Sequence, residues 1–273
     1  MKTTDFQFKK KFGQNFLTDT NLLRAICVDA GICENDNVLE IGPGAGALTS
    51  QIAQSTKGKV LAVEIDTTLQ PILNNNLSMY PNVEVMFCDI LKVKKEEIAS
   101  KFNNEQFRVV ANLPYYISTP IIFYLIESGL PIKSITVMLQ KELADRICAN
   151  AGTKDYGGIS VVLGLYGKVQ KTRDVSRKLF NPQPNVDSSV VHIEISQDRV
   201  KNIVQIAQVV KMCFAMRRKT LSNNLMQGLG LPRAKIDDML NDIGISPTAR
   251  AESLEKESYI LLTDTLQIKN LLK

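Results

Sequence analysis

Residues 40–46 read Glu40-Ile41-Gly42-Pro43-Gly44-Ala45-Gly46, and they stand between a short apolar run, residues 38–41, and a helical pattern, residues 47–54. Glycines where a strand meets a helix let the backbone approach a ligand closely and leave amide groups exposed at the helix N-terminus. The spacing is G-x-G-x-G with Ala47 next, so the dinucleotide fingerprint G-x-G-x-x-G is only approximated. This departure favours a ligand without a pyrophosphate, such as a nucleoside with an amino-acid tail. Glu40 can meet a cationic group of that tail.

Strand-like and helix-like patterns alternate on both sides of this loop. The expected strands are residues 38–41, 60–65, 83–87, 107–111 and 134–139, and the expected helices are residues 20–30, 47–54, 69–77, 120–126 and 141–149. Pro71 suits the first turn of its helix. Such alternation predicts a mostly parallel sheet with helices on both faces. Residues 159–169 and 188–195 are expected to be two closing strands, joined by a loop rich in Pro and Asn.

The pattern changes near residue 196 to helices alone, at residues 200–215, 221–229, 233–243 and 258–269. This change predicts an α/β domain over residues 1–196, with an N-terminal arm at 1–17. A small all-helical domain would occupy residues 197–273.

Polar side chains follow three further strands of the predicted sheet. Glu64 ends the second strand, 22 residues past Gly42, while Asp89 follows the third strand and Asn112 the fourth. Because the carboxyl ends of parallel strands meet at one edge of a sheet, these side chains line one crevice together with Glu40. Glu64 is placed to bind ribose hydroxyls, and Asp89 to accept a hydrogen bond from an adenine amine.

Asn112-Leu113-Pro114-Tyr115 carries four chemical features in one run. The side-chain carbonyl of Asn112 accepts hydrogen bonds, and Pro114 biases Leu113 to an extended backbone whose carbonyl points away from a helix. Tyr115 offers a flat face for stacking on a base. An exocyclic amine held by two acceptors over an aromatic ring is placed to attack an electrophilic methyl group. A strand-ending proline turn with a core tyrosine would explain the same four residues in isolation.

The charge is distributed unevenly. The net charge is +5, and the charged residues from Arg199 to Ile236 are all basic, whereas acids predominate from Asp237 to Glu257. A segregated basic block suggests contact with phosphates, and Lys9-Lys10-Lys11 adds a second basic cluster. Each cluster alone is equally consistent with a solvated surface that favours solubility.

Size and composition limit the function classes. The chain has 273 residues, of which 44% are hydrophobic, and no apolar run approaches the roughly 20 residues that span a bilayer. Its five cysteines form no C-x-x-C pair, which argues for a reducing cytoplasm and against a disulfide scaffold or a zinc site. His192 is the only histidine and lies inside the apolar alternation of residues 190–195, which argues against a Ser-His-Asp hydrolase or a His-rich metal site and for a structural strand residue.

Several motifs in one order identify a family. The chain resembles the S-adenosylmethionine-dependent ribosomal RNA adenine N6-dimethyltransferases, and most of all their bacterial small-subunit (16S) type. The matching segments are residues 11–17 (Lys11-Phe12-Gly13-Gln14-Asn15-Phe16-Leu17), 40–46, 64–66, 89, 112–115, 138–142, 180–188 and 217–221. The resemblance covers nearly the whole chain and implies a Rossmann-like class I methyltransferase domain with a small helical C-terminal domain that binds RNA.

The resemblance also implies roles for individual residues. S-adenosylmethionine would be held by Gln14, Asn15, Leu17, Gly42, Gly44, Glu64, Ile65, Asp89, Ile90 and Asn112. The catalytic set would be Asn112, Leu113, Pro114, Tyr115 and Phe180, and RNA would be bound by Lys9, Lys10, Lys11, Arg217, Arg218 and Lys219. Tyr115 and Phe180 would sandwich a base taken out of its stack. No metal is implied, because the sulfonium cation supplies the leaving group.

The implied substrate is a pair of adjacent adenosines in the 3′-terminal hairpin of small-subunit rRNA, dimethylated during small-subunit biogenesis. The implied partner is the pre-30S particle, bound by a cytoplasmic monomer. A large-subunit rRNA methyltransferase of the resistance type remains the closest rival, and a ribosome assembly factor without activity is a rival from another class. DNA adenine and protein glutamine methyltransferases use similar motifs, but a glutamine enzyme has no evident use for the basic helical domain. A cytosine C5 enzyme would need a Cys beside the proline, where this chain has Leu113.

Overall fold

The structure is a computed structural model that describes residues 16–196, 200 and 202–272, and these form two compact units. The first unit contains residues up to 144 together with 170–195, and the second contains residues 145–169 and those from 196 onward. The division expected from the sequence counted residues 145–169 with the first domain, whereas the structure groups them with the C-terminal helices.

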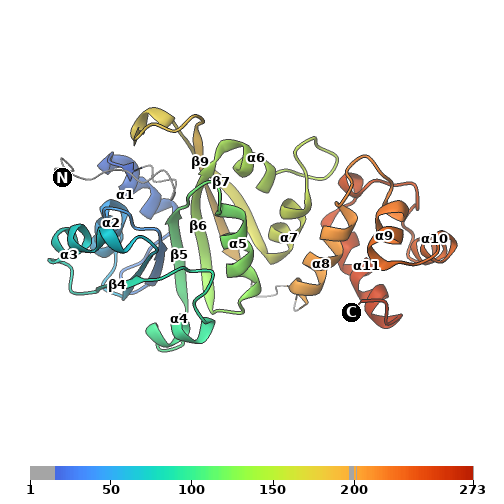
Figure 1. The fold of residues 1–273 in the computed structure, drawn as a ribbon, viewed down its shortest axis with the longest axis horizontal. Helices are drawn as coiled ribbons and strands as arrows, with labels where there is room; N and C mark the ends of the chain where they lie inside the picture. Colours follow the sequence, from blue (N-terminus) through green and yellow to red (C-terminus); the bar gives the residue numbers. More distant parts are fainter. Residues whose placement is uncertain (1–15, 197–199, 201, 273) are drawn as a thin grey trace. The chain divides into compact units, whose positions relative to one another are not determined.

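A seven-stranded sheet lies at the centre of the first unit, in the order β4-β3-β2-β5-β6-β9-β7 (Figure 1). The strands are β2 (Asn37–Ile41), β3 (Val60–Glu64), β4 (Val83–Phe87), β5 (Phe107–Asn112), β6 (Ile132–Gln140), β7 (Gly167–Val175) and β9 (Ser188–Ile195). Strands β2 to β6 are parallel, and β9 runs antiparallel to β6. The expected mostly parallel sheet is confirmed.

Helices connect the parallel strands and pack around the sheet (Figure 1). They are α1 (Thr20–Asp29), α2 (Ala47–Ser55), α3 (Gln70–Leu77), α4 (Lys95–Lys101), α5 (Ser118–Glu127) and α6 (Lys141–Ile147). Pro71 lies in the first turn of α3, as expected. The central strands are apolar on both sides, and Val38, Leu39, Val109 and Val110 are fully buried. A parallel sheet covered on both faces requires such uninterrupted apolar runs.

The strand expected at residues 159–169 is wrong. The structure has helix α7 (Gly158–Tyr166) there, and β7 begins only at Gly167. Ile159, Val161 and Val162 suggested a strand because β-branched residues are common in strands. In α7 almost every side chain is buried, against α8 (Ile203–Cys213) and α11 (Lys256–Ile268) among others. A helix that is apolar all round shows no helical period in its sequence.

A second, two-stranded sheet joins the start of the described chain to the Pro-rich loop. Strand β1 (Phe16–Leu17) pairs antiparallel with β8 (Phe180–Asn181), which follows the short 3₁₀ turn η3 (Arg177–Leu179). The pairing sets Leu17 opposite Phe180. It thereby fixes residues 16–18 beside the mouth of the crevice described below.

The second unit is helical beyond residue 202, as expected. Besides α8 and α11 it contains α9 (Leu221–Leu229) and α10 (Arg233–Asp242). Its core includes Leu225, Leu240 and Tyr259, none of which is exposed to solvent. Thr220 caps α9 through its hydroxyl, which accepts a hydrogen bond from the Asn223 amide. Among the described residues, no helix is both long and apolar enough to cross a bilayer.

Candidate active site

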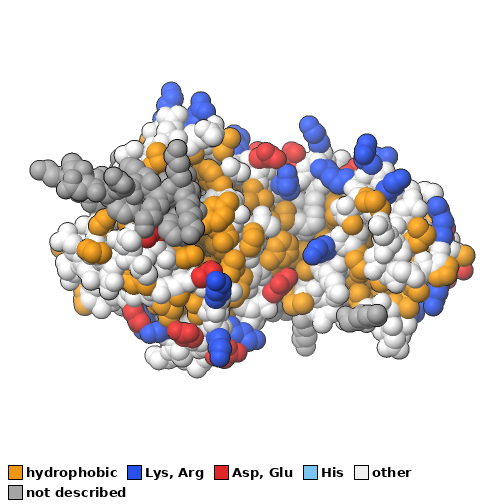
Figure 2. All heavy atoms as spheres, in the orientation of Figure 1, with side chains coloured by type: hydrophobic (Ala, Val, Ile, Leu, Met, Phe, Trp, Pro, Cys, Tyr) orange, Lys and Arg blue, Asp and Glu red, His pale blue; other side chains and the backbone are white. Residues whose placement is uncertain are grey.

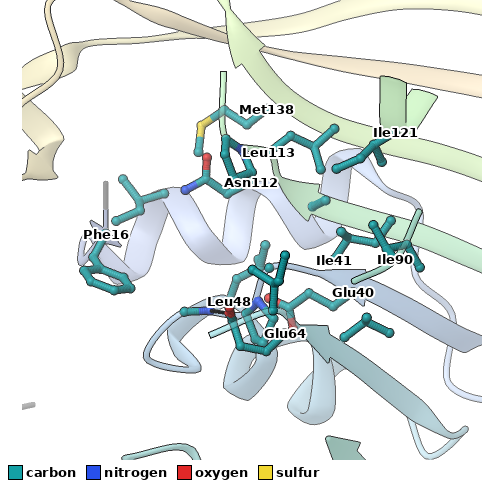
Figure 3. A pocket seen from close by; sticks show the side chains of 18 of the residues that line it. Phe16, Glu40, Ile41, Leu48, Glu64, Ile90, Asn112, Leu113, Ile121 and Met138 are labelled. Atoms are coloured by element: carbon teal, nitrogen blue, oxygen red, sulfur yellow. Dashed lines mark hydrogen bonds between the residues drawn. The ribbon is translucent and has the colours of Figure 1, made fainter. Parts of the chain in front are cut away.

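A crevice opens at the carboxyl ends of the parallel strands. Strand β2 has β3 on one side and β5 on the other, so the chain reverses its direction of winding there, and ligands of open α/β sheets bind at this point. Figure 3 shows Asn112 and Leu113 on one side of the cavity and Glu40 and Glu64 on the other, with Phe16 at its edge. The lining comes from the segments 16–18, 40–45, 47–48, 63–65, 88–90 and 111–117, with two residues from α1 and one each from α5 and β6.

The glycine-rich loop forms one wall through its backbone. Gly42, Gly44 and Gly46 all have positive φ, at 72°, 57° and 84°, which side chains rarely adopt. A Cβ on Gly44 would also lie 2.4 Å from the Phe16 ring, so a side chain there would displace that ring. Gly46 is the N-cap of α2. The loop therefore presents bare backbone to a ligand at a helix N-terminus, as its sequence predicts.

Glu64 ends β3 at the floor of the crevice, with only 5% of its surface exposed. Its Oε2 accepts a hydrogen bond from the Gly44 amide at 3.1 Å, and its Oε1 accepts one from the Asp66 amide at 2.8 Å. Burial raises the pKa of the Glu64 carboxyl, while these backbone N–H groups oppose the rise. Each oxygen retains a lone pair, so the carboxylate can still accept hydrogen bonds from hydroxyls.

Glu40 lies beside it and is almost wholly buried, at 1% exposure. Its Oε2 has no hydrogen-bond partner among the described residues. Burial, opposed by the Thr49 hydroxyl and aided by the nearby Glu64, raises the pKa of Glu40 to about 8. An orphaned carboxylate oxygen in a ligand crevice is costly unless a cation or donor meets it. Glu40 therefore fits the cationic tail predicted from its position in the loop.

The segments that follow β3 and β4 add apolar side chains and a carboxylate to the crevice. Ile65 and Ile90 both line it, the first 43% exposed and the second buried. Asp89 also lines the crevice, and its Oδ1 accepts a hydrogen bond from the Leu91 amide at 3.1 Å. Two apolar side chains and an acceptor suit a flat base whose amine needs a partner.

Asn112 and the three residues after it form a turn between β5 and α5. The Leu113 amide donates to the Met138 carbonyl at 3.2 Å, which continues the pairing of β5 with β6. The turn closes on the Pro114 carbonyl, which accepts from the Ser118 hydroxyl at 2.9 Å and the Ile117 amide at 3.1 Å. The Leu113 carbonyl is therefore not used by the turn, as its expected role requires.

Tyr115 is half-buried, and its hydroxyl is tied to the Ser188 hydroxyl at 2.7 Å. Burial raises the pKa of the Tyr115 phenol, so it is neutral at physiological pH. Ser188 begins β9 and is fully buried. A ring anchored at its far end is held in one orientation, which suits a stacking face.

Phe180 lies elsewhere. It is 5% exposed, and it packs in the core with residues that include Leu17, Val175 and Val190. In the described part of the chain it is not among the residues that line the crevice. The structure thus brings Tyr115 to the crevice without Phe180, and the sandwich of a base between the two rings stays a prediction.

The predicted RNA-binding residues fall into two groups. Lys9, Lys10 and Lys11 lie outside the described residues, as do Gln14 and Asn15 of the predicted cofactor set. Arg217, Arg218 and Lys219 are exposed in the loop between α8 and α9. Figure 2 shows lysine and arginine side chains gathered over this loop and over the loop that leads into α7.

Arg217 differs from its two neighbours in its contacts. Its guanidinium donates to the Lys154 carbonyl at 2.7 Å and lies 3.5 Å from a carboxylate oxygen of Glu252. It therefore joins three loops of the second unit. Within the described ranges, no group of three or more His, Cys, Asp or Glu side chains could hold a metal ion.

Comparison with known proteins identifies the family. A family model described as ribosomal RNA adenine dimethylase matches residues 5–267. The chain belongs to this family. Ribosomal RNA small subunit methyltransferase A of Bacillus cereus (strain B4264) is 44% identical over 97% of this chain and 94% of its own length. The protein of the same name from Bacillus thuringiensis (strain Al Hakam) has the same identity and coverage.

Solved structures of related enzymes share the fold. A dimethyladenosine transferase from Plasmodium falciparum has 28% sequence identity and a TM-score of 0.80, over 93% of this chain and 98% of the other. The 23S rRNA methyltransferase ErmE has 27% identity and a TM-score of 0.68, over 93% of this chain and all of the other. The Rossmann-like fold predicted for this family is therefore confirmed.

The sequence analysis missed several crevice residues, among them Phe16, Met138 and Tyr116. Phe16 packs on the glycine loop, Met138 lies behind Asn112, and Tyr116 is exposed at the crevice. Tyr116 could have been predicted from the sequence, because it directly follows Tyr115 and extends its aromatic run. Met138 and Phe16 lie in matched motifs, but their positions depend on strand register and on pairing with β8.

Proposed function

We propose that this protein transfers methyl groups from S-adenosylmethionine to the N6 amines of two adjacent adenosines in small-subunit ribosomal RNA, giving N6,N6-dimethyladenosine. The observation that carries the proposal is the turn at Asn112-Leu113-Pro114-Tyr115. It holds two acceptors and an anchored aromatic ring beside an acid-lined crevice at the carboxyl ends of β2 and β5.

The residues of the crevice fit the methyl donor. The donor, when bound, supplies an electrophilic methyl group on a sulfonium. Glu64 would accept from the ribose hydroxyls, and Asp89 from the adenine amine, between Ile65 and Ile90. The orphaned Oε2 of Glu40 would meet the positive charge of the amino-acid tail. Leu17 would cover that tail, with Gln14 and Asn15 from the arm.

Asn112 and Leu113 act on the acceptor amine. The N6 nitrogen is a poor nucleophile because its lone pair is delocalised into the ring. The Asn112 side chain and the Leu113 carbonyl would each hold one N–H bond, which favours a more tetrahedral nitrogen with its lone pair directed into the crevice. Proximity and orientation of this kind contribute up to about 7–11 kcal/mol. The nitrogen becomes acidic as its new bond forms, so its proton can leave without a dedicated base.

An RNA substrate implies further contacts, a partner and a cellular location. Tyr115 would stack on the extruded adenine, and the exposed basic residues of the second unit would contact RNA phosphates. Ribosomal RNA in an immature small subunit would be the partner, which places the protein in the cytoplasm. We also propose that the protein acts as a monomer.

A second candidate is methylation of large-subunit RNA, which the similarity to the 23S rRNA methyltransferase ErmE favours. Mass spectrometry of adenosines in both ribosomal RNAs from cells lacking the gene decides between them. The proposal requires that dimethyladenosine disappear from small-subunit RNA and return with a plasmid copy of the gene. Disappearance from large-subunit RNA alone would support the second candidate. An unchanged pattern in both RNAs would leave only a binding role.

A further inference from the structure

Two adjacent tyrosines occupy the crevice in opposite ways. Tyr115 is half-buried and tied through its hydroxyl to Ser188. Tyr116 is 59% exposed, although it lines the same crevice. In the described part of the chain, no hydrogen bond or ring contact involves the Tyr116 side chain. A large apolar ring is thus held open to solvent where the substrate must enter.

The backbone fixes where this ring stands. Tyr116 lies in the turn that closes on the Pro114 carbonyl, one residue before the Ile117 amide that completes it. Helix α5 begins two residues later, at Ser118. The turn therefore presents Tyr115 inward and Tyr116 outward from the same rigid segment.

An RNA substrate brings the bases that flank its target adenosine to the crevice as well. The target adenosine stays joined to its neighbours through the backbone when it is flipped, so a flanking base arrives at the crevice mouth. Unstacking leaves that flanking base with an uncovered face, and aromatic rings that bind single-stranded RNA cover such faces. The other ring expected to stack on RNA, Phe180, is buried in the core.

We propose that Tyr116 is a stacking platform for the base that flanks the target adenosine. The proposal rests on the proposed function, because it requires an RNA substrate. It assigns Tyr116 to substrate binding and not to the reacting amine, which Asn112 and Leu113 hold. The ring positions the strand so that the neighbouring base enters the crevice.

The test pairs a protein change with a substrate change. Binding of a synthetic hairpin with the 3′-terminal small-subunit sequence is measured by fluorescence anisotropy with S-adenosylhomocysteine present. One RNA is intact, and two others lack the base on the 5′ or the 3′ side of the target. Tyr116→Ala should weaken binding of the intact RNA by roughly 5- to 150-fold, the range of one base–aromatic stack. The loss should vanish with one of the two abasic RNAs.

Two control variants separate stacking from folding and from general surface effects. Tyr116→Phe keeps the ring and should bind all three RNAs as the wild type does. Met79→Ala removes an exposed apolar side chain outside the crevice and should also change nothing. Equal losses on all three RNAs, or no loss on the intact RNA, would overturn the proposal. Failure of the proposed function looks different, because the wild type would then not methylate small-subunit ribosomal RNA.

Discussion

The crevice of the first unit and the basic loop of the second differ in how their polar side chains are held. In the crevice, the polar side chains stand at or just after strand ends, and Glu64 is held there by hydrogen bonds from the Gly44 and Asp66 amides. In the basic loop, Arg218 and Lys219 are exposed, and neither side chain makes a hydrogen bond or ion pair to another described residue. Chemistry at one atom requires fixed geometry, whereas contact with phosphates requires mainly charge. Substitutions in the two regions should therefore differ in both size and kind.

The largest effect is expected at Asn112. Asn112→Ala should lower the single-turnover rate of methyl transfer by at least about 10²-fold, because one contact that is strongest in the transition state is lost. Cofactor affinity should fall only a few-fold, as measured by calorimetry. Asn74→Ala, an exposed substitution on α3, is the matched control. Near-normal turnover of Asn112→Ala would show that this side chain takes no part in the mechanism.

A substitution of Glu64 tests whether its carboxylate binds the ribose of the cofactor. Glu64→Gln keeps the shape of the side chain but removes the charge that strengthens hydrogen bonds from two ribose hydroxyls. Such charge-assisted bonds are worth about 1.5–3 kcal/mol each. Calorimetry should show cofactor affinity reduced by roughly 10- to 100-fold, with RNA binding unchanged. Glu127→Gln, on the exposed end of α5, controls for the charge. Unchanged affinity in Glu64→Gln would mean that the ribose binds elsewhere.

The same contrast explains how much the sequence could predict. Strand ends are marked in the sequence by an apolar run followed by a polar residue, so Glu64, Asp89 and Asn112 could be placed in one crevice. Phe180 could not be placed, because its burial depends on pairing with β1 and on packing against Leu17. Side-chain contacts between distant loops, such as those of Arg217, leave no local pattern.

Helix α7 shows a second limit of prediction from the sequence. Its residues are apolar on every side, because the helix is buried among others in the second unit. Periodicity distinguishes a helix from a strand only where one face meets water. The same residues therefore favoured a strand, and the expected grouping of residues 145–169 with the first domain followed from that error.

Burial of the Glu40 carboxyl predicts that the stability of the protein depends on pH, and this effect is intermediate in size among those expected here. Its folded pKa, about 8, exceeds its ordinary value of 4.5, so the folded protein holds the extra proton between these values. Stability of the ligand-free protein is therefore full below pH 4.5 and is lost as the pH rises toward 8. Glu40→Gln, which cannot ionise, should flatten this dependence in thermal unfolding curves. Glu64 and Cys27, which also face this carboxyl, remain in the variant.

Cofactor binding should then release the proton of Glu40. A cation beside the carboxyl favours its charged form, so binding at pH 7 should release up to about 0.9 proton, and affinity should rise by up to roughly tenfold per pH unit below pH 8. Calorimetry in buffers of different ionisation enthalpy measures this release directly. Release that is the same in wild type and Glu40→Gln would assign the proton to another group.

The smallest effects are expected in the basic loop, and they should separate Arg217 from its neighbours. Arg218→Ala and Lys219→Ala should each lower the magnitude of the salt slope of RNA binding by roughly 0.7–0.9, because each removes one phosphate contact. Melting temperature and cofactor affinity should not change, because both side chains are exposed. Lys57→Ala removes a charge from an exposed ion pair in the first unit and should leave the slope as it was.

Arg217→Ala should behave differently. Its guanidinium holds the Lys154 carbonyl and lies beside Glu252, so its loss should lower the melting temperature. The exposed ion pair and the exposed hydrogen bond each contribute little, at most about 1 kcal/mol, so the decrease in melting temperature should be small. The salt slope of the folded protein should fall by less than in Arg218→Ala. A decrease in the salt slope of Arg217→Ala as large as that of Arg218→Ala, with no change in melting temperature, would contradict this expectation. Arg217 would then contact RNA in the way proposed for its two neighbours.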